Sequence, residues 1–439
     1  MRYNILSHIG QNFKYAVFFN DIYTIIIIMI SDQDKTIIRE LAKQVRELAA
    51  LDVNRERERR IRDMNGLKSV RPPVWIDEIP WHEMDIDDEL KLCCTSSFAR
   101  EMETQFRRIL FRWKHIQADM VVEQAFYVKK TYTESSIGIQ IKEQTVATNE
   151  ANHIISHHYE DQLDTEEKVQ ALKLPIVTAD STADEKNLEI ANEILDGIMP
   201  VRLRGHMIYF APWDVIARYR GIENCFMDML GNPDLIHKTI GKFTEIYTAR
   251  FNQMQEQGLL DFNISDLHCT PPYTDELPAA DYDAGKVRFK DVWFRGMAQL
   301  FSSASPAMQD EFNLQYLRPF MEKCGLSYYG CCEPLDLFIP YLKKVSNMRK
   351  IGVSTWANIR SSAEQIGGDY VFAHKPNPAS AARFDRETVA REIEDVVKAA
   401  MENKCAYEFV LKDISTVNSR PQNLIDWVKT AQEVIDKYY

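Results

Sequence analysis

The chain has 439 residues, too many for one small domain and suitable for one large α/β barrel with additions. Hydrophobic residues make up 45% of it, which is enough for a sizeable core, and the formal net charge of −12 excludes an electrostatic footprint for nucleic acid. The eight cysteines include two adjacent pairs and do not resemble the disulfide framework of a secreted domain. We therefore expect free thiols and a cytoplasmic location.

The first 28 residues form a separate case. Residues 15–30 are apolar but interrupted by Asn20 and Asp21, and the unbroken part is far shorter than the ~20 residues that span a bilayer. They also lack the small-residue cleavage site of a signal peptide. We expect Met29 to be the native start, with residues 1–28 read from an upstream start codon. A membrane anchor, or an extra strand or helix on the body, is the alternative.

Helical periodicity begins after residue 31. Residues 32–51 carry apolar side chains at helical spacing. The mixed-sign charges of residues 54–63 are typical of a solvated helix face. We expect residues 1–70 to form an N-terminal helical extension and residues 71–439 to form the main domain.

Short apolar runs then alternate with amphipathic segments. Eight runs predict strands: residues 74–77, 120–126, 201–204, 293–300, 326–330, 350–354, 370–374 and 408–411. Helical patterns follow several of them, for instance at residues 336–345, 361–366 and 385–401. Such alternation predicts parallel strands joined by crossover helices, and eight strands close a TIM (β/α)8 barrel. An open doubly wound sheet is the alternative, although no glycine-rich phosphate loop follows the first strand.

Two longer segments exceed the minimal barrel unit. Residues 131–187 are expected to insert after the second strand, as a hairpin of residues 137–143 and 145–150 followed by helices over the barrel. Residues 259–289 contain three prolines and predict a stiff loop that covers the barrel mouth.

Three predicted strands end in reactive or charged side chains. Residues 326–333 read LSYYGCCE, which places two cysteines and a glutamate after a buried strand. Two other ends, FAHKP at residues 372–376 and FVLKD at residues 409–413, finish in a similar way. In an α/β barrel these ends share the face that carries the active site. We therefore predict an enzyme in which four side chains converge on one cavity: Cys331, Glu333, Lys375 and Asp413.

Further side chains on this face are candidate contacts for a substrate. Gln299 and Ser302 follow the fourth strand and offer an amide and a hydroxyl to a polar ligand. His206, just past the third strand, either lines the site or is a structural histidine. On the proline-rich loop, His268 is expected to contact substrate, with a metal site at residues 266–269 as the alternative.

Lys375 ends the seventh strand and has two possible partners. It is expected to bind either a carboxylate or phosphate of a ligand, or the neighbouring Asp413. Tyr329 and His374, which stand at the same strand ends, complete the candidate substrate-binding set.

Several segments resemble the uroporphyrinogen decarboxylase superfamily. They are RPPVW at residues 71–75, the helical stretch of residues 214–240 and KDISTVNSRPQNL at residues 412–424. The superfamily comprises tetrapyrrole decarboxylases and zinc methyltransferases that exchange a methyl group with a corrinoid protein, with cobalamin-independent methionine synthase as a more distant relative. The resemblance covers residues 71–439 and implies a TIM barrel.

The two branches match this chain to different degrees. Decarboxylases follow RPPVW with an arginine-containing segment that holds substrate carboxylates, whereas this chain has Asp77, Glu78 and Glu83, which repel a polycarboxylate. The His-x-Cys pair of the methyltransferases falls on Tyr329 to Cys331. The last cysteine of that branch, like the histidine of the decarboxylases, falls on Asp413.

The methyltransferase branch implies a zinc site. Zinc accepts thiolate and carboxylate ligands, and a catalytic zinc keeps one position open. The metal would deprotonate an acceptor thiol and fix it for attack on a methyl group. The candidate ligands are Cys331, Cys332, Glu333 and Asp413. Small cysteines that pack a strand end, or a cysteine nucleophile without metal, are the alternatives.

The resemblance implies methyl transfer between a small methylated substrate and a corrinoid protein or thiol. Zinc is the expected cofactor, with a corrinoid carried by a small partner protein, and a homodimer is a candidate assembly. The first alternative is decarboxylation of a tetrapyrrole or other carboxylate, with Asp413, Lys375 and His206 delivering protons. The second is a corrinoid- or ligand-binding barrel without catalysis. We expect no nucleic acid and no membrane as partner.

Overall fold

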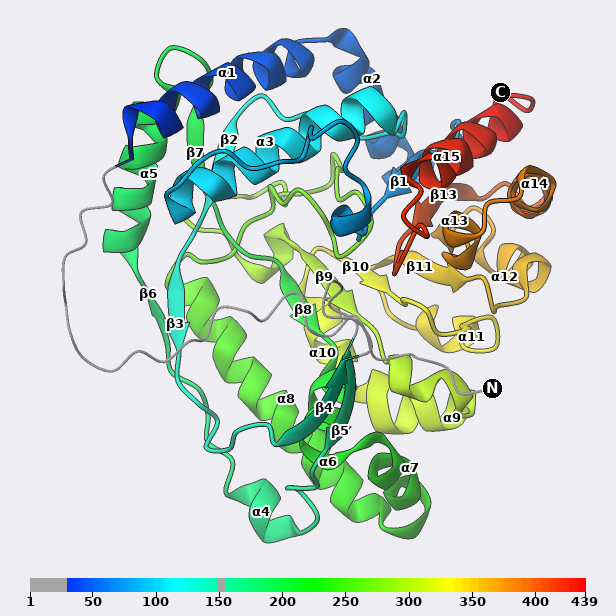
Figure 1. Ribbon diagram of the computed structural model, residues 1–439. Coiled ribbons are helices and arrows are strands. Elements are labelled where there is room, and N and C mark those ends of the chain that lie inside the picture. Colours follow the sequence, from blue (N-terminus) through cyan, green and yellow to red (C-terminus); the bar gives the residue numbers. More distant parts are fainter. Residues whose placement is uncertain (1–29, 148–154) are drawn as a thin grey trace.

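The central feature of the computed structural model, which describes residues 30–147 and 155–439, is a seven-stranded parallel sheet (Figure 1). All neighbouring strands in it are parallel. Their order is β1 (Val74–Ile76), β13 (Ala406–Leu411), β12 (Val371–Lys375), β11 (Met348–Ser354), β10 (Leu326–Tyr329), β9 (Trp293–Gly296) and β8 (Ile208–Phe210).

The predicted barrel is confirmed only as a parallel α/β sheet, because no ladder of hydrogen bonds closes it within the described ranges. The predicted third strand coincides with β7 (Val201–Arg204), but β7 pairs with β2 (Phe126–Lys129) in a separate two-stranded sheet. The chain then passes through Gly205, where a Cβ would lie only 2.5 Å from the carbonyl oxygen of Leu259. After this glycine it is β8 that pairs with β9 in the central sheet.

Most predicted strands coincide with observed ones, with two clear differences. The predicted strand at residues 120–126 overlaps β2 only at Phe126. The predicted strand at residues 293–300 stops at Gly296, and the short 3-10 helix η3 (Gln299–Ser303) follows. β8 was not predicted from the sequence.

The N-terminal helices form a second core with β2 and β7. The predicted helices at residues 32–51 and 54–63 are confirmed as α1 (Asp32–Ala49) and α2 (Asp52–Asn65). The apolar stripe of α1 packs on α3 (Ser97–His115) and α5 (Ser181–Leu195), away from the seven-stranded sheet. The prediction about Met29 and residues 1–28 concerns a segment outside the described part of the chain.

The remaining helices lie beside the central sheet (Figure 1). They are α6 (Pro212–Arg220), α7 (Ile222–Gly231), α8 (Pro233–Glu256), α9 (Pro306–Gln309), α10 (Gln315–Lys323), α11 (Ile339–Leu342), α12 (Ile359–Ile366), α13 (Ala379–Ala382), α14 (Arg386–Glu402) and α15 (Pro421–Ile435). No helix of the described ranges combines the length and the apolar character that crossing a bilayer requires.

The segment at residues 131–187 forms two small antiparallel pairs. β3 (Tyr132–Glu134) pairs with β6 (Val177–Ala179), and β4 (Glu143–Ala147) pairs with β5 (Ile155–Tyr159). The predicted hairpin within residues 137–150 is therefore wrong for β4, whose partner strand comes later in the chain. The helix α4 (Glu166–Gln170) follows.

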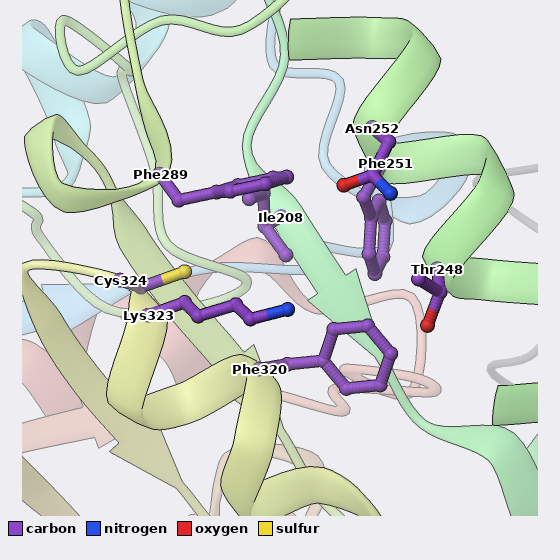
Figure 2. Close-up of a pocket in the computed structure, with 8 residues that line it drawn as sticks. All are labelled: Ile208, Thr248, Phe251, Asn252, Phe289, Phe320, Lys323 and Cys324. Carbon is purple, nitrogen blue, oxygen red and sulfur yellow. The ribbon is translucent and has the colours of Figure 1, made fainter. Parts of the chain in front are cut away.

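A small pocket lies where α8 and α10 pass β8 (Figure 2). Phe251 and Phe320 form part of its wall, and Lys323 and Cys324, just before β10, complete one side. The cysteines selected from the sequence follow β10, so the pocket and those thiols lie at opposite ends of this strand.

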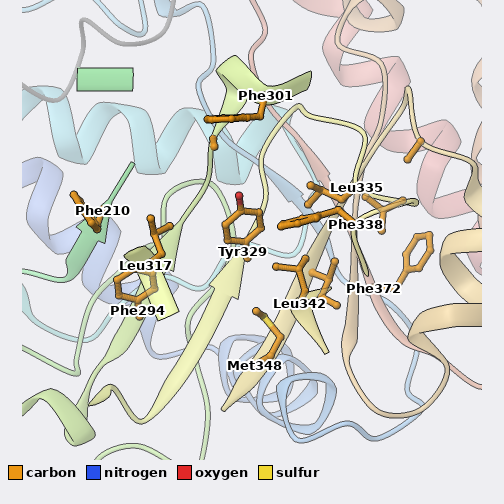
Figure 3. Close-up of a cluster of buried hydrophobic side chains, with 14 of the residues drawn as sticks. Phe210, Phe294, Phe301, Leu317, Tyr329, Leu335, Phe338, Leu342, Met348 and Phe372 are labelled. Carbon is orange, nitrogen blue, oxygen red and sulfur yellow. The ribbon is translucent and has the colours of Figure 1, made fainter. Parts of the chain in front are cut away.

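The two faces of the central sheet differ in chemistry because successive side chains of a strand point to opposite faces. One face carries Phe294, Tyr329 and Phe372, which pack in the large apolar core (Figure 3). The other face carries buried charged and aromatic side chains from five neighbouring strands: Arg295, Tyr328, Lys350, Lys375 and Glu408. A charged buried face is unusual for a parallel sheet, and it is the face from which the site is built.

Candidate functional site

Two adjacent thiols and a distant carboxylate meet at one end of the sheet. Cys331 and Cys332 follow β10, and Asp413 follows β13. The two Sγ atoms lie 3.7 Å apart, and the Cys332 thiol donates to Oδ2 of Asp413 at 2.7 Å. Ligand atoms of all three residues lie within 4.8 Å of one another. Cys331 is fully buried and Cys332 half-buried, so the cluster is shielded from solvent on one side.

The turn after β10 places the thiols. Gly330 has a φ of 109°, a conformation that side-chain-bearing residues rarely adopt. A Cβ on Gly330 would lie 2.5 Å from Cδ1 of Leu335 and 3.1 Å from Cα of Gly352. Only glycine fits this close approach between β10 and β11.

Glu333 fixes the backbone of the thiol loop. Its Oε2 accepts the Cys331 amide at 2.9 Å, and its Oε1 accepts the Ala298 amide at 3.2 Å. Burial raises the pKa of this carboxyl, and the Cys331 thiol raises it further. Both oxygens thus serve main-chain donors, and Glu333 is not part of the three-residue ligand group.

The proline-rich loop brings two more side chains to the thiols. Hydrogen bonds from Cys269 and Cys332 hold the pKa of the Cys331 thiol well below its usual range, although burial opposes this, and His268 adds a third bond. Burial raises the pKa of Cys269, and its hydrogen bond to Cys331 raises it further. The surroundings of Cys331 therefore favour its thiolate form more than those of Cys269.

Backbone strain accompanies this loop and its neighbours. Four non-glycine residues of the site have positive φ: Glu78 at 49°, His268 at 45°, Cys269 at 74° and Asp413 at 57°. Each such residue costs of order 1–2 kcal/mol, and strained residues of this kind cluster at functional sites. The Cys269 amide donates to Oδ2 of Asp266 at 3.1 Å, which supports the turn.

Lys412 neutralises the carboxylates next to the thiols. Its buried ammonium lies 2.8 Å from Oδ2 of Asp413 and 3.7 Å from Oε2 of Glu78. The Asp413 amide also donates to Oε2 of Glu78 at 3.0 Å. Burial raises the pKa of Glu78 well above its usual range, although Lys412 opposes this shift. Asp413 thus pairs with its chain neighbour Lys412, whereas the sequence offered Lys375 either a ligand anion or Asp413 as its partner.

His206 lies in a different place from the thiols. Its Nε2 is 2.8 Å from the carbonyl oxygen of Lys130, and its ring packs edge-on against Tyr132 at 4.9 Å. Burial lowers its pKa to about 4. These contacts are those of a structural histidine, which the sequence left open as an alternative.

Tyr329 and His374 point to the apolar face of the sheet. The Tyr329 hydroxyl accepts from Asn313 at 2.8 Å, and its ring packs on Phe338 (Figure 3). His374 donates from Nδ1 to the carbonyl of Val353 at 3.1 Å, and burial lowers its pKa to about 3. Neither side chain is on the face of the thiols.

The side chains of Gln299 and Ser302 form hydrogen bonds with residues close to them in sequence. The Ser302 hydroxyl donates to the carbonyl of Gln299 at 2.6 Å within η3, and the Gln299 amide donates to Sδ of Met297 at 3.7 Å. By contrast, His268 does reach Cys331 and approaches Tyr209 at 5.2 Å between ring centroids. Sequence reasoning selected His268 as a substrate contact and considered Cys269, its neighbour, only within the alternative metal site at residues 266–269.

The thiol–carboxylate cluster fits a zinc ion in donor type. Two thiolates on tetrahedral zinc stand about 3.8 Å apart, since each Zn–S bond is about 2.3 Å long, and the two Sγ atoms are 3.7 Å apart. Cysteine binds zinc as the thiolate, so Cys332 would lose on metal binding the proton that it donates to Asp413. Cys331, Cys332 and Asp413 would hold the ion.

Sheet and cluster together define a parallel α/β protein with a buried thiol–carboxylate site. No family model and no curated protein matches the chain. It is similar to the solved structure of a methyltransferase from Methanosarcina mazei, with 11% identity, a TM-score of 0.47 and coverage of 87% of this chain and 99% of that one. It is also similar to a B12-independent methionine synthase from Shewanella sp. W3-18-1, with 11% identity, a TM-score of 0.33 and coverage of 69% and 76%.

Proposed function

We propose that the chain is an enzyme that transfers a methyl group between a small methylated substrate and a corrinoid protein or thiol. The observation that carries this proposal is the cluster of Cys331, Cys332 and Asp413, whose ligand atoms lie within 4.8 Å of one another. A cysteine thiolate is a strong nucleophile toward a methyl group and a strong metal ligand.

The chain's own residues have distinct tasks in this proposal. Glu333 fixes the Cys331 backbone, and Gly330 forms the turn that presents both thiols. Lys412 lies 2.8 Å from Oδ2 of Asp413 and supplies a counter-charge to that carboxyl group. A zinc ion bound by these ligands would supply Lewis acidity that favours the thiolate form of an acceptor.

Decarboxylation receives less support from the site. It would need Asp413, Lys375 and His206 around one substrate, but the contacts of His206 are with Lys130 and Tyr132. The thiol cluster would also have no task in such a reaction.

Metal content and methyl transfer test the proposal together. Protein purified without chelator is expected to hold one zinc ion per chain and to demethylate methylcobalamin, a surrogate for a corrinoid protein, when a small thiol is added. Cys331→Ser should lose the metal and at least about a hundredfold of the rate, because removal of a catalytic group typically costs this much. Cys324→Ser is the matched control, since Cys324 is equally buried but lies at the other end of β10.

Two outcomes would contradict the proposal. One is full activity and metal content in Cys331→Ser. The other is release of carbon dioxide from a porphyrinogen by metal-free protein, with Asp413 mattering more than Cys331.

A further inference from the structure

The ammonium of Lys375 is buried without a hydrogen-bond partner. Lys375 ends β12 and is only 3% exposed. Its Nζ has no hydrogen-bond partner among the described residues, and it lies 5.3 Å from the ring centroid of Tyr328. Burying an ammonium without a hydrogen-bond acceptor costs free energy, so this position calls for an explanation.

Two further donors without partners stand at the same place. The Tyr328 hydroxyl and Nε of Arg295 are both fully buried and have no hydrogen-bond partner in the described ranges. Arg295 and Tyr328 are register partners on β9 and β10, and the guanidinium lies 4.2 Å from the Tyr328 ring centroid. The cationic side chains of Lys375 and Arg295 therefore both lie near the ring of Tyr328. Each of these three side chains has a donor atom without a hydrogen-bond acceptor in the described ranges.

Lys350 shows that the same face can neutralise a lysine. This side chain lies on β11, next to β12, and is also fully buried. Its ammonium donates to Oε1 of Glu408 at 3.0 Å and to Oγ1 of Thr270 at 2.8 Å. Of these two buried lysines, it is Lys375, at the end of the sheet near the thiols, whose ammonium lacks a hydrogen-bond partner in the described part of the chain.

The carboxyl group of Asp266 does not serve as an ion-pair partner for Lys375. Asp266 interacts with Lys375 and Arg295 at a distance, but burial raises its pKa well above the usual range. Its Oδ2 accepts the Cys269 amide, and its Oδ1 has no partner in the described part of the chain. Among the described residues no carboxylate accepts a hydrogen bond from Lys375, so a bound anion would satisfy its ammonium.

We propose that Lys375, with Arg295 and Tyr328, binds a carboxylate group of the substrate. A carboxylate only accepts hydrogen bonds and has two oxygens, which suits one ammonium and its neighbouring donors. Lys375 stands at the C-terminal end of β12, and the thiols follow the C-terminal end of β10 in the same parallel sheet, so the bound group lies at the same end of the sheet as the thiols. The substrate is then a small carboxylic acid whose methyl group stands near its carboxylate. This assignment of the methyl group rests on the proposed function, whereas the anion site itself does not.

Binding of matched probes tests the site directly. Acetate and benzoate are compared with their neutral isosteres, acetamide and benzamide, by calorimetric titration of the full chain. The wild type is expected to bind each carboxylate at least tenfold more tightly than its amide, because a charge-assisted hydrogen bond is roughly twice as strong as a neutral one. Lys375→Met should abolish this preference, and Lys375→Arg should retain part of it. Lys323→Met controls for binding in the pocket of Figure 2, which Lys323 lines.

Stability separates binding from a structural role. Lys375→Met should raise the thermal midpoint of the unliganded protein, because it removes an unpaired buried charge, while a structural lysine would lower it on removal. Cys331→Ser should keep the preference for carboxylates over amides. A protein that binds carboxylates but transfers no methyl group would therefore contradict the proposed function and not the anion site. Equal binding of acid and amide by the wild type, or an undiminished preference in Lys375→Met, would overturn the inference.

Discussion

The Sγ atom of Cys332 lies 2.7 Å from Oδ2 of Asp413, although 81 positions separate the two residues in sequence. They follow β10 and β13, between which β11 and β12 lie in the sheet. Strands three places apart in a flat sheet would be about 14 Å from each other, since neighbouring strands are about 4.8 Å apart. The segments that follow these strands therefore bring together side chains from strands that are not neighbours, and this convergence forms the site.

Removing the charge of Asp413 should weaken the metal site. In Asp413→Asn the side chain keeps its shape but loses the negative charge that attracts a cation and pairs with Lys412. We expect zinc to bind roughly 10- to 100-fold more weakly, a range typical for altered ligand shells. Competition titration with a coloured chelator measures this. Asp436→Asn, an exposed aspartate paired with Arg71, is the control that should leave the affinity unchanged.

Gly330→Ala should destabilise the fold beyond the cost of its backbone conformation. The new Cβ would meet Leu335 at 2.5 Å, in addition to the strain of a φ of 109°. We expect a loss of about 2–4 kcal/mol in the free energy of unfolding. Gly197→Ala has a φ of 72° with nothing within 4 Å, so it isolates the strain and should cost only about 1 kcal/mol. Equal losses in urea titrations of both variants would refute the close approach of β10 and β11.

The two lysines on the charged face should respond oppositely to replacement. Lys350→Met leaves Glu408 buried without its counter-ion, and breaking such a pair costs about 3–5 kcal/mol. The same change at Lys375 breaks no hydrogen bond within the described residues and should be neutral or stabilising. Chemical denaturation of both variants without added ligand checks this contrast, and a large loss for Lys375→Met would show that a partner had been overlooked.

His374 should make the fold sensitive to acid. Its folded pKa of about 3 lies below the ordinary value of 6.5, so the folded state holds the neutral ring. Its contribution is complete above pH 6.5 and decreases as the pH falls from 6.5 toward 3, by about 1.4 kcal/mol per pH unit. Between pH 7 and pH 5 the wild type should therefore lose about 2 kcal/mol more than His374→Leu. Parallel losses in the two proteins would mean that another group dominates.

Strand ends could be predicted from the sequence because apolar runs stop where polar residues begin. This placed Cys331 and Asp413 at the right ends of β10 and β13. The alternation of side chains along a strand could also have separated Lys375 from His374, since neighbours in a strand point to opposite faces. The same argument sets Tyr329 apart from Tyr328.

Long-range contacts of irregular segments could not be predicted. Cys269 reaches Cys331 only through the path of a loop, which has no periodicity to reveal its neighbours. Glu333 has the right type for a metal ligand, but the turn at Gly330 directs its oxygens to two backbone amides. The break between β7 and β8 likewise depends on crowding at Gly205 by a loop far along the chain.

X-ray absorption spectroscopy of the zinc-loaded protein tests the central claim most directly. The account predicts one zinc ion per chain with two sulfur neighbours at about 2.3 Å and lighter ligands at about 2.0–2.2 Å. Cys331→Ser should lose one of the two sulfurs, or all bound zinc, and Cys324→Ser should match the wild type. A zinc shell without sulfur, or protein that binds no zinc, would contradict a thiolate metal site at Cys331, Cys332 and Asp413.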